Sequence, residues 1–594
     1  MLKKIEELVR EAEDNLKGTT KLGDYVDYDH RDTVQKIIAY SNSKHTSGDK
    51  DSLGREKPFF NIVSAAINIW YRATDIDRKD VKFIPNSQKS VPLAFVANVI
   101  LKNWMDDTRF GVFLNTWGRT LAKFGSAVVK FVEKDGELIP SVVPWDRIVC
   151  DPVDFDAQPR IEKFYKTPAQ LRKMKQYDQK QIDSLISAIT TRKTSKGDQV
   201  DKLSNFIELY EVHGELDSRL LQENPDFGAD DKDIKYVQQM HVVSLTQNEK
   251  GEHVDFTLYK GKEAEDPYMK TDLIEEDGRV LAIGAVEYLF DAQWMQNHTV
   301  KNMKDTLDIV SKLIMQTADP RYAGRNVLTA IETGDIFVHA PDMPLTRVAN
   351  DKPDISALQN FGMMWQNMSR ELSSTPDAMR GNTMPSGTPY ALGQYLGSQA
   401  NSLFEIMTEN KGLALEDMIK IKIIPHIKKK LKNKNEILRI FDSQGIEEID
   451  SIYVPLEARK RYQEFAKEAT LNGQIPEGFN QMAGENEIKQ ELMGDKRSFV
   501  PDELDKKTWA DIFSDFQWDS IRVEVTNEQS DKQAVLQTIN TMLQTIASNP
   551  MVLQDENARQ LFNMALRETS VLSPLQLKTP VSPAGSGAMP PVAA

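Results

Sequence analysis

The sequence of 594 residues contains a single cysteine, Cys150, so no disulfide can form within the chain. One thiol in a chain of this length is typical of proteins that work in a reducing compartment or in an intracellular assembly. No stretch approaches the ~18 consecutive apolar residues that a membrane-spanning helix requires. The first residues form an amphipathic charged pattern and lack the apolar core of a signal peptide. We therefore expect a soluble protein.

Motifs for several common chemistries are also missing. No glycine-rich turn with a following lysine is present to hold nucleotide phosphates, and no GxSxG turn is present to carry a serine nucleophile. None of the eight histidines pairs with another at the i, i+4 spacing of a zinc-binding helix. We predict that the chain is not an enzyme and uses no cofactor, although an active site could still be assembled from residues far apart in the sequence.

The acidic stretch "DPVDFD", from Asp151 to Asp156, offers three carboxylates close together. It lacks the later glycine and the bidentate glutamate of a calcium-binding loop. An aspartate followed by a proline is typical of a turn. We predict a turn at this place and no metal site, with a bound cation as the weaker alternative.

Charge of one sign dominates the chain, whose formal net charge is −15. Such a surface repels nucleic acid and anionic membranes on average, so any contact with DNA must be local or weak. Residues 420–439 are the exception, with eight Lys or Arg and one acidic residue. This cluster could meet DNA phosphates or a negatively charged neighbouring subunit, and a solvated helix face is the plainer interpretation. Its candidate residues are Lys428, Lys429, Lys430 and Lys432.

Hydrophobic periodicity predicts an α+β first half. Residues 59–123 have mostly helical spacing, and a β-branched stretch follows that is broken at Asp135-Gly136, a strong signal for a two-residue hairpin turn. A helix is then predicted to begin with Thr167 as N-cap and Pro168 as its first residue. The strand-like runs after that helix indicate small antiparallel sheets.

The middle of the chain predicts a pair of long helices. No proline or glycine interrupts the sequence from Glu287 to Met315, where apolar residues recur at helical spacing. A second helix is predicted over residues 353–373, and the residues between the two helices resemble short strands around a turn. Because these helices have little globular core around them, we expect their apolar stripes to face one another and neighbouring subunits.

A polar loop, "STPDAMRGNTMPSGTPY", follows the second helix and contains three prolines and two glycines. After it, a third helix is predicted from Tyr390 to about Ile424, where Pro425 must kink or end the helix because it lacks the backbone N–H. Residues 573–594 show no apolar period and predict a disordered tail.

Several passages, taken in chain order, resemble the portal proteins of tailed bacteriophages. They are "FFNIVSAAINIWYRA" followed by "VKFIPNS", "AKFGSAVVKFVEKDGE", "DGRVLAIGAVEYLFDAQWMQN", "SSTPDAMRGNTMPSGTPYALGQYL" and "VEVTNEQSDKQAVLQTI". Each passage is weak alone, and the resemblance rests on their order across most of residues 59–572. Residues 160–275 and 457–515 are assigned to parts of the family fold by position only.

The resemblance implies the ring-forming portal fold, which is mainly helical and of the α+β class. Its parts would be a wing (1–286), a stem of two helices (287–315 and 353–373), a clip (316–352), a tunnel loop (374–390), a channel helix with further strands (391–456), a return from the wing to the crown (457–531) and crown helices (532–572).

The resemblance also implies a function, a conduit for double-stranded DNA during packaging and ejection. About twelve copies would form a ring at one vertex of the capsid in the virion, after assembly in the host cytoplasm. The implied partners are the terminase large subunit, a head–tail adaptor, and the major capsid and scaffolding proteins, with no membrane. Two other classes stay open: a nuclease with a dispersed carboxylate site, and a head or tail scaffold that never touches DNA.

The implied site residues lie in two segments. The tunnel loop would face DNA without sequence specificity through Arg380, Asn382, Thr383, Ser386 and Thr388. The clip would bind an acidic partner surface through Arg321, Tyr322, Arg325 and Arg347. An alternative for the three arginines is that they solvate the small β module or contact neighbouring subunits.

Deleting Gly381–Gly387 tests the assignment of the tunnel loop. We expect the shortened protein to form the same ring, because the loop joins two helices and contributes little core, and we expect particles to package or retain less DNA. The measurement is the DNA content of particles assembled with the shortened protein. Normal packaging and retention would show that the loop assignment is wrong.

Overall fold

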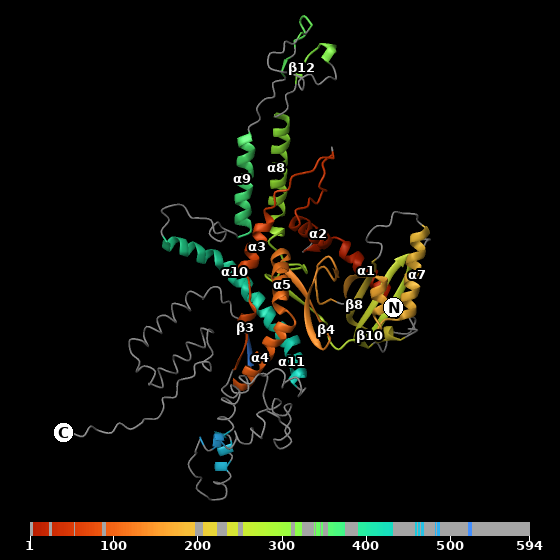
Figure 1. The fold of residues 1–594 in the computed structure, drawn as a ribbon, viewed down its shortest axis with the longest axis vertical. Helices are drawn as coiled ribbons and strands as arrows, with labels where there is room; N and C mark the ends of the chain where they lie inside the picture. The colour runs from red at the N-terminus through yellow and green to blue at the C-terminus, as the bar shows by residue number, and fades with distance from the viewer. Residues whose placement is uncertain are drawn as a thin grey trace, which may run out of the picture. The chain divides into compact units, whose positions relative to one another are not determined.

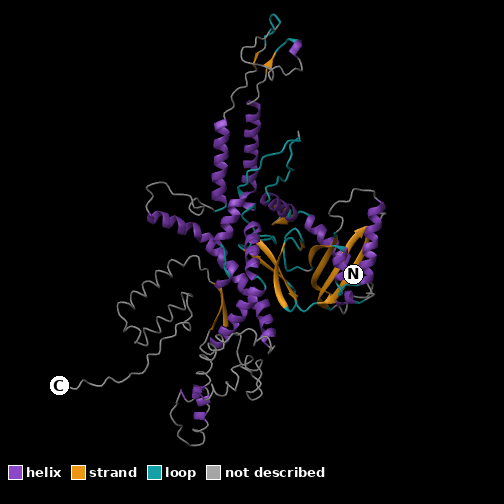
Figure 2. Cartoon of the chain, in the orientation of Figure 1, coloured by secondary structure: helices purple, strands orange, loops and turns teal. Residues whose placement is uncertain are grey.

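The computed structural model of the chain describes residues 4–22, 26–52, 54–85, 91–157, 159–195, 206–222, 235–247, 253–310, 315–322, 338, 340–344, 346–347, 355–374, 390–431, 458–459, 461–463, 465–467, 482, 484–486 and 521–525. These residues form helices and antiparallel strands of an α+β protein, as expected (Figure 2). The chain divides into two compact units. The first consists of Met1–Asp75 and Val112–Ala414, and the second of Ile76–Gly111 and Leu415–Ala594.

The largest sheet of the first unit has five antiparallel strands in the order β10-β9-β8-β7-β6. Three of its strands, β8, β9 and β10, confirm the strand-like runs predicted after the helix at Thr167. Their bounds are β6 (Ile148–Val149), β7 (Arg160–Lys166), β8 (Ile207–Asp217), β9 (Tyr236–Gln247) and β10 (His253–Lys262).

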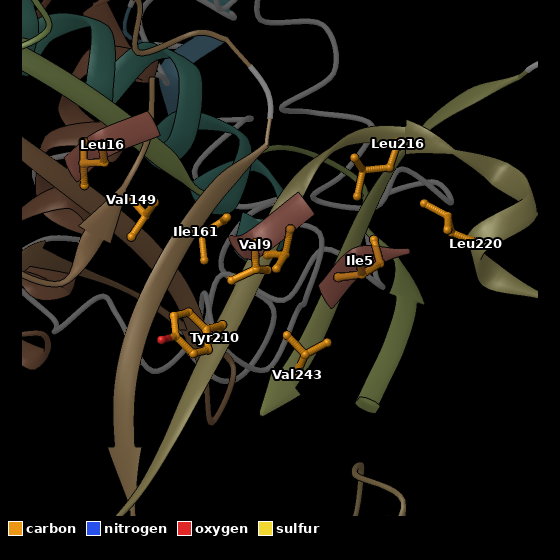
Figure 3. Close-up of a cluster of buried hydrophobic side chains, with 10 residues drawn as sticks. Ile5, Val9, Leu16, Val149, Ile161, Tyr210, Leu216, Leu220 and Val243 are labelled. Carbon is orange, nitrogen blue, oxygen red and sulfur yellow. The ribbon is translucent and has the colours of Figure 1, made fainter. Parts of the chain in front are cut away.

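Helices cover both faces of this sheet because apolar side chains of its strands alternate between the faces. On one face, Val9 of helix α1 (Ile5–Lys17) is buried in a cluster with Tyr210 and Val212 (Figure 3). On the other face, α6 (Pro168–Lys173) and α7 (Gln179–Ser195) bury side chains against Leu209 and Val242.

The helix predicted from Thr167 begins as expected but is divided in two. The Thr167 hydroxyl accepts a hydrogen bond from the Gln170 backbone N–H at 3.3 Å, and the Gln170 side chain accepts one from the Thr167 N–H at 2.9 Å. The prediction of one continuous helix is wrong, since α6 ends at Lys173. A new N-cap at Asp178, whose carboxylate accepts the N–H of Lys180 at 2.9 Å, starts α7.

A second sheet of the first unit has the order β11-β4-β5 and includes the predicted hairpin. Its strands are β4 (Ser126–Lys134), β5 (Glu137–Val143) and β11 (Tyr268–Asp272). At the turn between β4 and β5, Asp135 has φ 55° and Gly136 has φ 81°. Lys134 pairs with Glu137 across these two residues, which confirms the two-residue turn.

The remaining elements of the first unit are shorter or mostly helical. They are β1 (Thr20–Leu22), β2 (Val26–Tyr28), α2 (His30–Ser41), α3 (Val63–Ala73), most of α5 (Phe110–Phe124), α8 (Phe290–Val310), β12 (Met315–Gln316), β13 (Thr346–Arg347), α9 (Ile355–Leu372) and most of α10 (Tyr390–Met418). The α10 helix begins at the predicted residue. Within the described residues, every helix is too short or too polar to cross a bilayer.

The second unit contains a two-stranded sheet made by residues far apart in the sequence. Strand β3 (Val81–Pro85) pairs with β14 (Ile521–Val525), and α4 (Val91–Asp107) contacts β3. The side-chain amide of Asn98 on α4 accepts the Phe83 N–H at 2.8 Å and donates to the Phe83 carbonyl at 2.9 Å. An amide group thus takes the place that a further strand would occupy along β3.

The interruption predicted near Pro425 takes the form of a π-helical turn, and the chain stays helical beyond the proline. The residues before it form a π-helical turn, Ile419–Ile423, and α11 (Ile424–Leu431) continues through the proline. The Ile424 N–H bonds the Ile419 carbonyl, five residues earlier. The change from α-helical to π-helical bonding accommodates the missing N–H of proline.

Glycine is required where the end of α5 meets a returning segment of the first unit. Gly125 follows α5 with φ +75°, and a Cβ at this position would lie 2.7 Å from the carbonyl carbon of Ile283. A Cβ on Gly284 would lie 2.3 Å from the Lys123 carbonyl oxygen. Side chains would therefore separate these two backbones, and only glycine at both positions permits their contact.

Two glycine substitutions test this close approach. We expect Gly136→Ala to lower the free energy of unfolding by about 1 kcal/mol, because its φ is positive while nothing lies within 4 Å of the new Cβ. Gly125→Ala has a similar φ and a crowded site, so we expect a loss of about 3 kcal/mol or more. Chemical denaturation measures both values. Equal losses would show that the close approach does not exist in solution.

Candidate functional site: the helix pair and the segments that follow it

Two long helices, α8 and α9, lie side by side in the first unit (Figure 1). They correspond to the predicted pair, with one correction. The first helix was predicted to reach Met315, whereas the structure describes α8 to Val310 and places Met315 in strand β12. The pairing of Met315 with Arg347 of β13 explains why the helical pattern does not continue to this residue.

Buried polar side chains attach the first turns of α8 to the segment before α3. The Gln293 side chain accepts the Ile62 N–H at 2.9 Å and donates to the Phe60 carbonyl at 2.7 Å. Asn297, one turn further along, accepts the Phe60 N–H at 3.0 Å. Gln293 also donates to the Asn297 side chain at 3.0 Å. These bonds fix the direction in which α8 leaves the sheets.

Small residues of α9 are the ones buried at the contact with α8. In α9 only Gly362 and Ser369 are buried. A Cβ on Gly362 would lie 3.4 Å from Cγ2 of Thr299 and 3.8 Å from Oε1 of Gln296, so the two helices approach closely at this point. The apolar stripe of α9 was expected to face α8 and neighbouring subunits. Ile355, Leu358 and Trp365 of this stripe are half-buried, and Phe361, Met368 and Leu372 are exposed in the single chain.

Several large apolar side chains of α9 are exposed. Residues 355–369 contain no charged residue at all. We call the exposed surface of these residues the uncharged face, and its large members are Phe361, Met363, Met364 and Met368, which are between 38% and 55% exposed. An exposed surface of this composition marks a site where another protein surface binds. Methionine suits such a surface because its unbranched side chain adapts to its partner.

The outer side of α8 carries exposed apolar groups of its own. Trp294 is 56% exposed and Leu307 is 48% exposed. The Trp294 ring stacks on His298, with 5.5 Å between ring centroids and 4° between the planes. The helix pair thus presents apolar surface from both of its helices.

The clip residues Arg321 and Tyr322 lie together in one short turn, Pro320–Tyr322. The Arg321 guanidinium donates to the Asp319 carboxylate through Nε at 3.0 Å and Nη2 at 2.6 Å, and this ion pair holds the pKa of Asp319 well below its usual range. Asp319 also accepts the Ala340 N–H at 3.0 Å, and the Tyr322 hydroxyl donates to the Val338 carbonyl. Both residues therefore stabilise the turn, which leaves only part of Arg321 for a partner.

The other predicted site residues are only partly described. Arg347 belongs to β13, but its side chain lies outside the described residues, as does all of Arg325. The whole set of tunnel-loop candidates, Arg380, Asn382, Thr383, Ser386 and Thr388, also lies outside them. In the second unit, Lys428 and Lys429 are exposed on α11, while the side chain of Lys430 and all of Lys432 are not described.

The acidic stretch at Asp151–Asp156 forms the predicted turn. One Asp151 oxygen accepts the N–H of Val153 at 2.8 Å and that of Asp154 at 3.1 Å. Asp156 pairs with Arg160 at 2.7 Å. No group of three or more potential metal ligands occurs among the residues that the structure describes.

Sequence reasoning missed Lys411, a fully buried cation on α10. Its Nζ donates to the Thr74 carbonyl at 2.7 Å, and burial lowers its pKa to about 8. Thr74 caps the carboxyl end of α3, so the ammonium group meets the negative end of a helix. A signal was present in the sequence, because Lys411 continues the apolar stripe of Phe404 and Met407 at helical spacing.

A comparison of the chain with protein-family models finds no family that matches, and a comparison with curated proteins finds no match. The function is therefore argued from the residues and their geometry.

Proposed function

We propose that this chain is the subunit of a portal ring, the DNA conduit at one vertex of a tailed-phage capsid. The observation that carries the proposal is the uncharged face of α9. The residues of α9 that the single chain buries are Gly362 and Ser369, and the large side chains of the uncharged face stay exposed. Neighbouring copies in a closed ring would cover the face, through one heterologous contact repeated around the axis.

The order of elements supports a portal rather than another ring. A helix, α3, is followed by strand β3, and the hairpin of β4 and β5 follows α5. The helix α8 leads to a small strand pair, β12 and β13, and the chain returns through α9. This is the sequence of parts that the resemblance to portals implies. We assign α8 and α9 to the stem and the residues around β12 and β13 to the clip.

The net charge also suits a conduit for DNA. Each phosphate paired with Lys or Arg adds affinity through counterion release, by a factor that grows with the number of contacts. A channel that gripped DNA in this way would oppose the motor that moves it. About twelve copies of a chain with net charge −15 would give a wall that mostly repels the duplex.

The partners follow from the assigned parts. The clip would dock the terminase large subunit during packaging and a head–tail adaptor afterwards, and the wing would contact the major capsid and scaffolding proteins. Double-stranded DNA would pass the tunnel loop without sequence recognition. The exposed edge of Arg321 remains the described candidate for an acidic surface on a clip partner.

Charges placed on the uncharged face test the proposal. We expect the double variant Met364→Glu and Met368→Glu to abolish ring formation, because twelve-fold repetition would bury these carboxylates without partners. Both side chains are exposed in the single chain, so its helical content and thermal midpoint should stay the same. Light scattering coupled to size exclusion measures the mass of the assembly.

The matched control is Met364→Leu with Met368→Leu, which keeps the surface apolar and should leave the ring intact. A charged double variant that assembles as the original chain does would exclude α9 as the contact between subunits. Loss of the assembly in both variants would show sensitivity to shape rather than to charge.

A further inference from the structure

A buried cluster of charged side chains joins the two sheets of the first unit. Lys130 of β4 contacts Glu162 of β7 at 2.8 Å and Glu211 of β8 at 2.9 Å. The hydroxyl of Tyr268, on β11, donates to Glu162 at 3.0 Å. Hydrogen bonds of this cluster therefore cross from the three-stranded sheet to the five-stranded sheet. Neither the charge pattern of the sequence nor the proposed portal function accounts for it.

His213 of β8 lies at the centre of this cluster and is 1% exposed. Its Nε2 lies 2.8 Å from a Glu211 oxygen, and its Nδ1 lies 2.8 Å from a Glu263 oxygen. A neutral imidazole has one N–H, and an ionised carboxylate only accepts hydrogen bonds. Between two ionised carboxylates, two such short contacts require an N–H on both ring nitrogens, which is the imidazolium form of His213.

Glu211, one of the two carboxylates in contact with His213, stays ionised, which supports the charge of His213. Burial raises the pKa of Glu211, but hydrogen bonds and charge interactions with His213 and Lys130 outweigh it and bring the pKa to about 2. Burial likewise opposes the charge of His213, and its bonds to Glu211 and Glu263 outweigh burial and raise its pKa above the ordinary value.

Other titratable groups face His213 from every neighbouring strand. Tyr268 of β11 lies edge-on to its ring at 5.1 Å. Arg160 of β7 is its direct neighbour across the sheet and pairs with Asp156 and Asp266. On β9, burial lowers the pKa of His241 to about 4, so this ring is neutral at pH 7. The positive charges next to Glu211 and Glu263 are thus those of His213 and Lys130.

We propose that the positive charge of His213 stabilises the contact between the five-stranded and the three-stranded sheet, and that loss of its proton at alkaline pH weakens this contact. We call His213 with its carboxylate partners the latch. The imidazolium holds Glu211, which in turn holds Lys130 of the other sheet. It also holds Glu263, which lies in the segment between β10 and β11 that connects the two sheets. Without the proton, the imidazole keeps one N–H, so it can donate to Glu211 or to Glu263 but not to both, and the cluster loses one positive charge.

The sign of the pH dependence follows from the raised pKa. The folded state keeps the proton of His213 at a pH where the unfolded chain has released it. The stabilisation is therefore complete below the pKa of about 6.5 of an unfolded histidine, and it is lost as pH rises through the folded pKa. Lys411 titrates with the opposite sign in the alkaline range, so the test compares variants at each pH.

Thermal unfolding of the full chain as a function of pH tests the latch. We expect His213→Gln to lower the unfolding midpoint at pH 7 and to remove the alkaline decrease that the original chain shows. Glu263→Gln keeps the histidine and removes one of its carboxylates, so the alkaline decrease should move to lower pH by about one unit. His298→Gln changes an exposed histidine of α8 and should behave as the original chain.

Hydrogen exchange locates the effect. After correction for the intrinsic rate, residues 263–272 should lose protection in the original chain as the pH rises through the folded pKa of His213, and in His213→Gln already at pH 7. An alkaline decrease that is absent from the original chain, or one with the same midpoint in Glu263→Gln, would overturn the proposal. If His213→Gln does not fold, the midpoint of Glu263→Gln decides alone.

Discussion

The surface that the helix pair offers to other molecules depends on the close approach of α8 and α9 at Gly362. A Cβ at this position would be 3.4 Å from Cγ2 of Thr299, so the backbone of α9 comes close to α8 here. The methionines and the phenylalanine of the uncharged face are exposed in the single chain. Burying this area against a neighbour releases free energy at roughly 25 cal/mol per Å² of apolar surface. A closed ring is the assembly in which every copy gains that burial.

The rest of the first unit holds the helix pair in place through buried polar groups rather than through apolar contacts alone. Gln293 and Asn297 join α8 to the segment before α3. Lys411 joins α10 to the carboxyl end of α3. Buried polar groups of this kind are costly unless each one finds its partner, so they permit one arrangement and penalise the others. A structural ring through which DNA moves under force requires such a fixed geometry.

Local patterns in the sequence predicted the elements well. Strands β8, β9 and β10, the Asp135-Gly136 turn and the N-cap at Thr167 depend on neighbours within a few residues, and the structure confirms them. The break before Asp178 was not predicted, because a second N-cap divides the helix, and the interruption expected at Pro425 takes the form of a π-helical turn.

The candidate site was only partly predictable for a physical reason. The periodicity of apolar residues identified the stripe of α9. Periodicity cannot tell whether a stripe packs against the same chain or against a neighbouring subunit. In the structure, the residues of α9 that are buried are Gly362 and Ser369. The latch at His213 was invisible because its partners come from four strands and one connection far apart in the chain. The tunnel loop, on which the resemblance to portals depends most, lies outside the described residues, so its assignment stays a prediction.

An end-on image of the purified protein by electron microscopy tests the central claim most directly. The account predicts closed rings of about twelve subunits around a channel that is wide enough for duplex DNA. The helix pairs of neighbouring copies should touch along α9. Single copies or dimers, or rings whose channel is too narrow for a duplex, would contradict the account.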